Sequence, residues 1–184
     1  GCATVALAEQ GAFVTGVDID EGALAVAKDR CLEYGLNAEL LNINATQIKE
    51  RLKGRHFDFI IFYASLEHML IEERLCAMKD TWEMLSEGGL WVITETPNRL
   101  WYFDAHTSML PFMMWLPDDL AFRYAKFSKR DNFKDKFTNF NADSITDFLR
   151  QGRGVSYHEF ELAMKNVDGL NIASTLNSFR KKRY

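Results

Sequence analysis

The sequence has 184 residues, of which 47% are hydrophobic and 26% are charged, which suits one packed domain rather than a disordered chain. The formal net charge of −4 gives no basic footprint and so does not favour nucleic acid as a partner, and no apolar run approaches the roughly 18 residues that span a bilayer. Three scattered cysteines, Cys2, Cys31 and Cys76, lack metal-ligand spacing, so we expect free thiols in a reducing cytoplasm.

The first 43 residues predict helices and strands in alternation. A glycine follows each predicted helix, at Gly11 and Gly35, and can close it. Asp20 precedes the second helix and can cap it through a side-chain oxygen. The predicted elements are a helix over 1–10, a strand over 13–17, a helix over 21–34 and a strand over 38–43.

The next 54 residues continue this alternation. In "FDFIIFYASLEHM" the core Phe57–Tyr63 is apolar throughout, which is typical of a parallel strand covered on both faces. An amphipathic helix follows, with apolar residues three or four apart, and Gly88–Gly89 is expected to close it. A strand over Leu90–Thr96 then ends at Pro97. This rhythm indicates a parallel α/β sheet.

From residue 98 to 141 no clean period appears. Aromatic and basic side chains crowd this stretch, and we interpret it as an inserted lid or cap that is helical in pieces. A helix is expected over 144–151. "SYHE" at 156–159 has the capping-box pattern, which predicts a helix from 157 to about 165, although its β-rich composition leaves a strand open.

Polar residues follow the predicted strands, where an open parallel sheet binds its ligands. Asp18 ends the first strand, and its carboxylate can accept two hydrogen bonds from ribose hydroxyls. Asn44 and Ala45 follow the second strand and can face a base through an amide and a backbone N–H. Ala64 opens the segment after the third strand. Gly1 opens a helix, whose bare N–H groups suit an anionic ligand group.

The spacing of these pieces resembles a known family. From Gly1 through "LAEQGAFVTGVDID", then "NA", "FDFIIFYASLEHM" and "LSEGGLWVITETPNR", residues 1–99 are similar to the class I S-adenosylmethionine-dependent methyltransferases. The likeness is greatest to the small-molecule branch that includes the ubiquinone-biosynthesis O-methyltransferases. It implies a Rossmann-like, mostly parallel sheet with helices on both faces, and S-adenosylmethionine as cofactor. The cofactor-binding residues that it implies are Gly1, Asp18, Ile19, Asn44, Ala45 and Ala64.

By this resemblance Asp18 binds the ribose, Asn44 and Ala45 flank the adenine, and Ala64 approaches the methionine end through its backbone. Gly1 is the last glycine of the cofactor loop. The family's first strand and earlier glycines should precede Gly1, so we expect a chain that begins inside the cofactor motif, with the central strand missing. Asn44 stands where the family often has Asp, and no terminal antiparallel hairpin is evident.

The expected organisation is a cofactor-binding α/β core over 1–99, an insert or lid over 100–142, and a C-terminal helical segment of the same domain over 143–184. Methyl transfer is an in-line displacement in which the enzyme supplies alignment, and a base assists a hydroxyl acceptor. His68 and His106 are the candidate bases, and His158 is more typical of a helix start. Asp104, two residues before His106, can orient its imidazole if the loop turns back.

We therefore predict methyl transfer to a small-molecule acceptor, with a hydroxyl oxygen as the favoured target atom. The aromatic content suits a quinone, phenol, lipid or sugar about equally. We expect no metal site, and oligomeric state is not indicated. Two alternatives stay open: an NAD-dependent oxidoreductase, which also uses a glycine-rich turn and an acid after the second strand, and a non-catalytic binding module.

Overall fold

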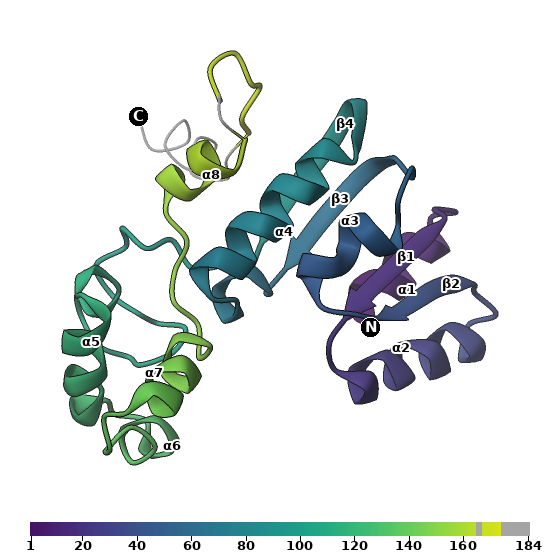
Figure 1. Cartoon of the computed structure of the whole chain (residues 1–184). Helices are drawn as coiled ribbons and strands as arrows, with labels where there is room; N and C mark the ends of the chain where they lie inside the picture. The colour runs from purple at the N-terminus through teal and green to yellow at the C-terminus, as the bar shows by residue number, and fades with distance from the viewer. Residues whose placement is uncertain (165–166, 174–184) are drawn as a thin grey trace, which may run out of the picture.

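The computed structural model describes residues 1–164 and 167–173 of the chain. Figure 1 shows a half that contains the strands, a group of helices formed by residues 113–149, and a last helix that returns to the strand-containing half. The expected C-terminal segment 143–184 falls partly outside the described residues, at 165–166 and 174–184. In the part that is described, no helix has both the length and the apolar character to cross a bilayer.

The first two strands form a parallel pair that contacts two helices. β1 (Val14–Asp18) pairs along its whole length with β2 (Ala38–Asn42). α1 (Cys2–Glu9) and α2 (Glu21–Glu33) contact these strands and each other. The side chain of Asp20 accepts a backbone N–H from the first turn of α2 at 3.1 Å, so the predicted N-cap is confirmed.

The next two strands form a second parallel pair. β3 (Phe57–Tyr63) pairs with β4 (Leu85–Thr94), and α4 (Ile71–Glu83) lies between them in the sequence. The prediction that Gly88–Gly89 closes the helix was wrong, because both glycines belong to β4. The register with β3 shifts in this stretch, and Gly88 has a φ of +76°, a backbone conformation that glycine adopts without strain.

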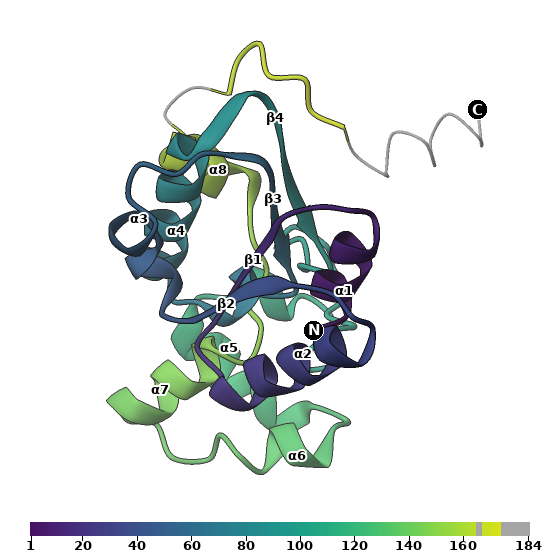
Figure 2. The ribbon, with the colours of Figure 1, turned by 90° about the vertical axis from the view of Figure 1, so that its right-hand side faces the viewer.

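The four strands form two separate two-stranded sheets rather than one. Hydrogen bonds join β1 to β2 and β3 to β4, and among the described residues none joins β1 to β3 (Figures 1 and 2). This arrangement keeps the predicted parallel pairing within each sheet. It corrects one expectation: β3 is not covered on both faces. Phe62 is buried, but Phe59 and Tyr63 are 39% and 56% exposed.

Short helical turns connect the two sheets and complete their packing. Phe62 packs with Ala77 and Met78 of α4 in one apolar cluster. A second cluster, formed by Ile43, Ile48, Leu52 and Met84, packs against apolar residues of β2 and β3. The connecting turns are η1 (Ala45–Gln47) and α3 (Ile48–Arg51).

Residues 113–149 form a helical insert with a core of its own. Four phenylalanines, Phe122, Phe133, Phe137 and Phe148, are buried, with neighbouring ring centroids 5.2 to 6.0 Å apart. Such aromatic pairs add to the stabilisation from apolar burial. The aromatic-rich stretch 98–141 is helical in pieces, as predicted, and the helix Ala142–Leu149, most of which was expected in the C-terminal segment, packs with it. The elements of the insert are η3 (Met113–Trp115), α5 (Asp118–Tyr124), η4 (Ala125–Phe127), α6 (Asp131–Lys134) and α7 (Ala142–Leu149).

After the insert the chain returns to the sheet half. α8 (Tyr157–Met164) lies against α4 (Figure 1), and a buried ion pair joins Arg74 to Glu159 at 2.7 Å. Glu159 also accepts the backbone N–H of Ser156 at 2.9 Å, which is half of the predicted capping box. The helical alternative for this segment is confirmed, and the strand alternative was wrong.

Candidate active site

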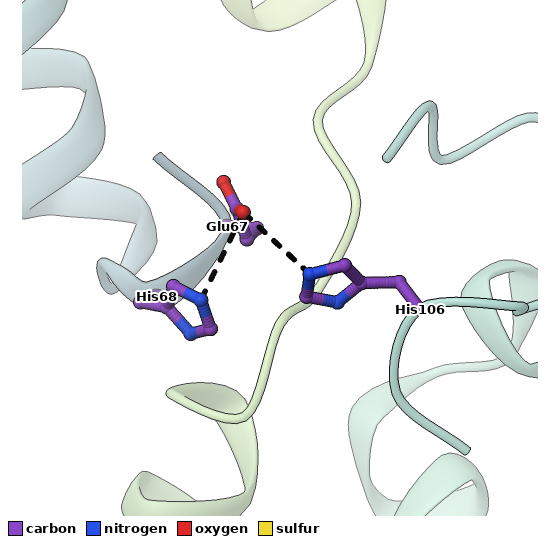
Figure 3. Close-up of side chains that lie close together, drawn as sticks. All are labelled: Glu67, His68 and His106. Atoms are coloured by element: carbon purple, nitrogen blue, oxygen red, sulfur yellow. Dashed lines mark ion pairs between the residues drawn. The ribbon is translucent and has the colours of Figure 1, made fainter. Parts of the chain in front are cut away.

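Three side chains from two parts of the chain converge beyond the carboxyl end of β3 (Figure 3). Glu67 and His68 belong to the turn η2 (Leu66–His68), and His106 comes from the loop between β4 and the insert helices. Nε2 of His68 lies 3.8 Å from Oε1 of Glu67, and Nε2 of His106 lies 3.9 Å from the same oxygen. The structure thus brings together the two predicted catalytic histidines.

Glu67 is the centre of this cluster and is 0% exposed. Its Oε2 accepts the hydroxyl of Thr96 at 2.9 Å. Its Oε1 is buried and has no hydrogen-bond partner among the described residues, although both imidazoles face it. Burying a carboxylate oxygen without a hydrogen-bond donor costs free energy. A positive group between this oxygen and the imidazoles would offset that cost.

His68 is held from the opposite side of its ring. Its Nδ1 lies 2.8 Å from the backbone oxygen of Arg150, at the end of α7. Arg150 in turn forms two hydrogen bonds with the carboxylate of Glu73, at 2.7 and 2.9 Å. The Arg150 guanidinium holds the pKa of Glu73 below its ordinary value. An ion pair between α4 and the end of α7 therefore fixes the carbonyl that orients His68.

His106 is presented by a tight loop around Asp104. The buried carboxylate of Asp104 accepts backbone N–H groups from His106, Thr107 and Ser108, at 3.2, 2.9 and 2.7 Å. The expectation that Asp104 orients the imidazole directly was wrong, because it binds the loop backbone instead. The imidazole Nδ1 pairs with the hydroxyl of Thr107 at 2.9 Å.

Gly152 packs against this loop and leaves no room for a side chain. A Cβ on Gly152 would lie 2.6 Å from Oγ1 of Thr107 and 2.9 Å from Nδ1 of His106. Its φ of +117° also lies in the region that favours glycine. The imidazole position therefore depends on the absence of a side chain at this residue.

The residues expected to bind the cofactor lie at the ends of β1 and β2. Asp18 is exposed at the carboxyl end of β1, and its Oδ1 accepts the N–H of Asp20 at 2.9 Å. Ile19 follows it and is also exposed. The side chain of Asn42, at the end of β2, binds the backbone oxygens of both residues at 3.2 and 3.0 Å. These contacts fix the backbone that carries the Asp18 carboxylate.

Asn44 has a local structural role. Its side-chain oxygen accepts the N–H of Thr46 at 2.9 Å, and its own N–H is bound by the Gln47 side chain at 3.1 Å. The two residues form a capping box at η1, and Ala45 is the first residue of that turn. The amide oxygen that was expected to meet an adenine is therefore already engaged by the backbone.

Two further predicted residues, Ala64 and Gly1, are distinguished by their backbone conformation or packing. Ala64, directly after β3, has a φ of +45°, an unusual conformation for a residue other than glycine, and such strain clusters at ligand sites. Gly1 precedes α1, and a Cβ there would lie 3.0 Å from Cα of Ala27 in α2. His158 lies apart from the cluster, exposed on α8 and 3.0 Å from Glu161.

Glu67 was not among the residues predicted for the site. The sequence carried one signal for it, the acidic residue beside His68 directly after an apolar strand. Although no metal site was expected, Glu67, His68 and His106 each offer one ligand atom, and these atoms lie within 4.8 Å of one another. Among the described residues this cluster is the set that could hold a metal ion.

Comparison with known proteins supports the predicted resemblance to methyltransferases. Residues 1–89 match the family described as "Methyltransferase domain". The chain is 39% identical over 99 residues to a ubiquinone biosynthesis O-methyltransferase of Pseudomonas paraeruginosa (strain DSM 24068 / PA7). It is 34% identical over the same length to that of Pseudomonas fluorescens (strain Pf0-1). These matches cover 54% of this chain and 41% of each relative.

The chain therefore spans less than half the length of the curated relatives that it matches. The family match covers β1, β2, β3 and the first residues of β4, and the cluster residues Glu67 and His68 lie within it. His106 lies beyond the 89 residues of the family match. Residues 1–89 match a methyltransferase domain, and the predicted resemblance of this chain to the class I S-adenosylmethionine-dependent methyltransferases is confirmed.

Proposed function

We propose that the protein is a methyltransferase that moves the methyl group of S-adenosylmethionine to a hydroxyl oxygen of a small-molecule acceptor. One observation carries this proposal: a buried carboxylate and two imidazoles gather beyond the carboxyl end of β3, next to the domain that matches the family. The cofactor supplies a methyl group activated by a sulfonium. The residues of this chain bind, align and remove a proton.

The cofactor would lie along the carboxyl ends of the strands. Asp18 suits the ribose, since its carboxylate is exposed and its backbone is fixed by Asn42. Ala64 suits the methionine end, since its left-handed backbone turns directly after β3. Ile19, Ala45 and Gly1 would line the same side. Asn44 would act through the turn that it caps rather than through its amide oxygen.

The acceptor hydroxyl would lose its proton beside the histidine pair. His106 and His68 both use Nδ1 for contacts with the protein. Each Nε2 is left facing Oε1 of Glu67 (Figure 3). The negative charge of Glu67 stabilises an imidazolium formed when either ring takes a proton. A positioned base of this kind contributes typically 10²–10⁴-fold to a rate.

Two alternatives are weaker. An NAD-dependent oxidoreductase would also bind its cofactor through an acid at a strand end, here Asp18 of β1, but the family match favours methyl transfer. A non-catalytic binding module would keep the fold without turnover. The relatives are named for ubiquinone biosynthesis and O-methylation, so the first acceptor test uses a phenol, with catechol as the probe, while lipid and sugar acceptors remain in the panel. We also propose a reducing compartment such as the cytoplasm, because Cys2, Cys31 and Cys76 are all free thiols.

The test uses the full-length protein and two measurements. Calorimetric titration with S-adenosylhomocysteine should show binding, and Asp18→Ala should weaken it by about 10- to 100-fold, since hydrogen bonds to a charged group contribute about 1.5–3 kcal/mol each. Turnover of catechol, followed with methyl-labelled cofactor, should fall about 10²–10⁴-fold in His106→Ala with cofactor affinity unchanged.

His158→Ala is the matched control, because this histidine is exposed, pairs with Glu161 and is not part of the cluster. It should leave both measurements as in the wild type. Absence of S-adenosylhomocysteine binding would overturn the proposal. Binding without turnover of any acceptor in the panel would favour the non-catalytic module.

A further inference from the structure

We propose that Glu67, His68 and His106 bind a divalent transition-metal ion of the Zn²⁺ type. The three side chains direct one oxygen and two nitrogens at a common point (Figure 3). This inference deepens the proposed function, because the ion would occupy the site assigned to the acceptor hydroxyl. Metal binding itself can be measured without turnover.

The hydrogen-bond partners assign the protons on both rings. Nδ1 of His68 lies 2.8 Å from the backbone oxygen of Arg150, which can only accept, so Nδ1 carries the hydrogen. The hydroxyl of Thr107 has one proton, and it is directed at the carbonyls of Gln151 and Gly152, at 3.0 and 3.2 Å. Nδ1 of His106 therefore donates to Thr107 at 2.9 Å.

With Nδ1 protonated, each neutral imidazole presents a bare lone pair at Nε2. Both lone pairs point toward Oε1 of Glu67, which itself has no donor among the described residues. Three electron-rich atoms thus converge in a partly buried space. Such an arrangement is unfavourable unless a positive charge lies between them.

The separations favour an ion over a shared proton. An N–H···O hydrogen bond needs about 2.7–3.2 Å, and the two N···O distances are 3.8 and 3.9 Å. Two ligands on a tetrahedral ion with bonds near 2.05 Å lie about 3.3 Å apart. The site is thus about half an ångström wider than a loaded one. The imidazoles, 46% and 38% exposed, have room to rotate inward.

The ligand types select the ion. Two imidazole nitrogens and one carboxylate oxygen suit Zn²⁺ and its transition-metal neighbours, whereas Mg²⁺ and Ca²⁺ prefer oxygen ligands alone. The surrounding contacts match what such ligands require. Each Nδ1–H is bound by a protein oxygen, and Oε2 of Glu67 accepts the hydroxyl of Thr96. Three protein ligands leave a position open for an acceptor oxygen.

A hydroxyl bound at that position would become more acidic. Its proton passes to water, the oxygen lone pair forms the bond to the methyl carbon, and the carbon–sulfur bond breaks with its electron pair on sulfur. The products are the methyl ether and S-adenosylhomocysteine. Because His106 precedes the insert and Glu67 follows β3, the ion would also tie the insert to the sheet half.

The test measures metal binding by the full-length protein after removal of metals with a chelator. Titration with Co²⁺, followed by visible absorption, should saturate at one equivalent, and Zn²⁺ should displace it while Mg²⁺ should not. His106→Ala should weaken Co²⁺ binding by more than the 10- to 100-fold that loss of an outer contact costs. Thr96→Val, which removes the contact to Oε2 but keeps the side-chain shape, should weaken it by about 10- to 100-fold.

His158→Ala again serves as the control and should bind Co²⁺ as the wild type does. The inference is overturned by a wild type that binds no Co²⁺, or by binding that survives unchanged in His106→Ala. If the metal-free protein binds S-adenosylhomocysteine and methylates catechol at the full rate, the proposed function stands with the histidines as bases. If Co²⁺ binds at this site but S-adenosylhomocysteine does not, the metal site stands and the proposed function fails.

Discussion

The sheet half and the helical insert are packed in different ways. The insert closes one compact core, in which Phe122, Phe133, Phe137 and Phe148 are buried against one another. The apolar residues of the sheet half form two separate clusters, and β3 leaves Phe59 and Tyr63 partly in solvent. The family match falls on the sheet half alone. The part that is similar to known proteins is therefore the sheet half, and the part with a single compact core is the insert.

The two parts meet at the candidate active site. Glu67 and His68 come from the sheet half, and His106 comes from the loop that leads into the insert. Cofactor binding should consequently depend on the sheet half, and turnover should depend on both parts. Three sets of variants test this division, in order of decreasing expected effect.

The largest effect is expected from truncating a buried side chain in each core. Phe148→Ala should cost about 3–5 kcal/mol and Met78→Ala about 2–5 kcal/mol of unfolding free energy, because each leaves a cavity. Urea denaturation measures both losses. S-adenosylhomocysteine affinity should fall in Met78→Ala, in the sheet half, and persist in Phe148→Ala. Equal losses of affinity in the two variants would contradict the division.

A smaller effect is expected at the loop that presents His106. Asp104→Asn removes a charge that accepts three backbone N–H groups and the hydroxyl of Ser108. Hydrogen bonds to a charged acceptor contribute about 1.5–3 kcal/mol, and we expect a destabilisation of that size. Catechol turnover should fall while S-adenosylhomocysteine affinity is kept. Asp58→Asn, at an exposed position on β3, should change neither quantity.

The smallest effect is expected from the ion pair behind His68, and it depends on pH. Arg150 lowers the pKa of Glu73 in the folded protein, so the pair stabilises the fold above the ordinary carboxylate pKa of about 4.3. That contribution is lost as the pH falls through the lowered pKa. Glu73→Gln should therefore lower the free energy of unfolding by up to about 1 kcal/mol at pH 7, because a partly exposed ion pair contributes little more than that.

Urea denaturation between neutral and acidic pH measures this difference. The wild type should lose its advantage over Glu73→Gln as the solution becomes acidic, and Glu72→Gln, at the exposed neighbouring position, should follow the wild type. A gap between wild type and Glu73→Gln that stays constant with pH would show that the pair does not titrate as inferred.

The periodicity of the sequence was sufficient to predict the order of the four strands and of α1, α2 and α4. Apolar runs and capping residues such as Asp20 act locally, so their effect is visible in the sequence. The boundary at Gly88–Gly89 was missed because paired glycines end helices and also permit bulges in strands. Asn44 and Gln47 carried a capping-box pattern that could have revealed the structural role of Asn44.

The site itself was only partly predictable. His68 and His106 were chosen for their chemistry, but their proximity depends on contacts between distant segments, such as Thr107 with Gln151. The partner that unites them, Glu67, is a charged residue in a fully buried position, which is rare unless such a residue is paired. No local pattern in the sequence marks that burial.

The tight packing at Gly152 has a consequence for how variation in this protein should be read. A residue with no side chain contributes no functional group, yet any replacement would push against the ring and hydroxyl that hold His106 in place. A substitution there, in the loop after α7, would displace His106 while every side chain of the candidate site stays chemically unchanged. Natural variants at this glycine deserve the same scrutiny as changes to the histidines.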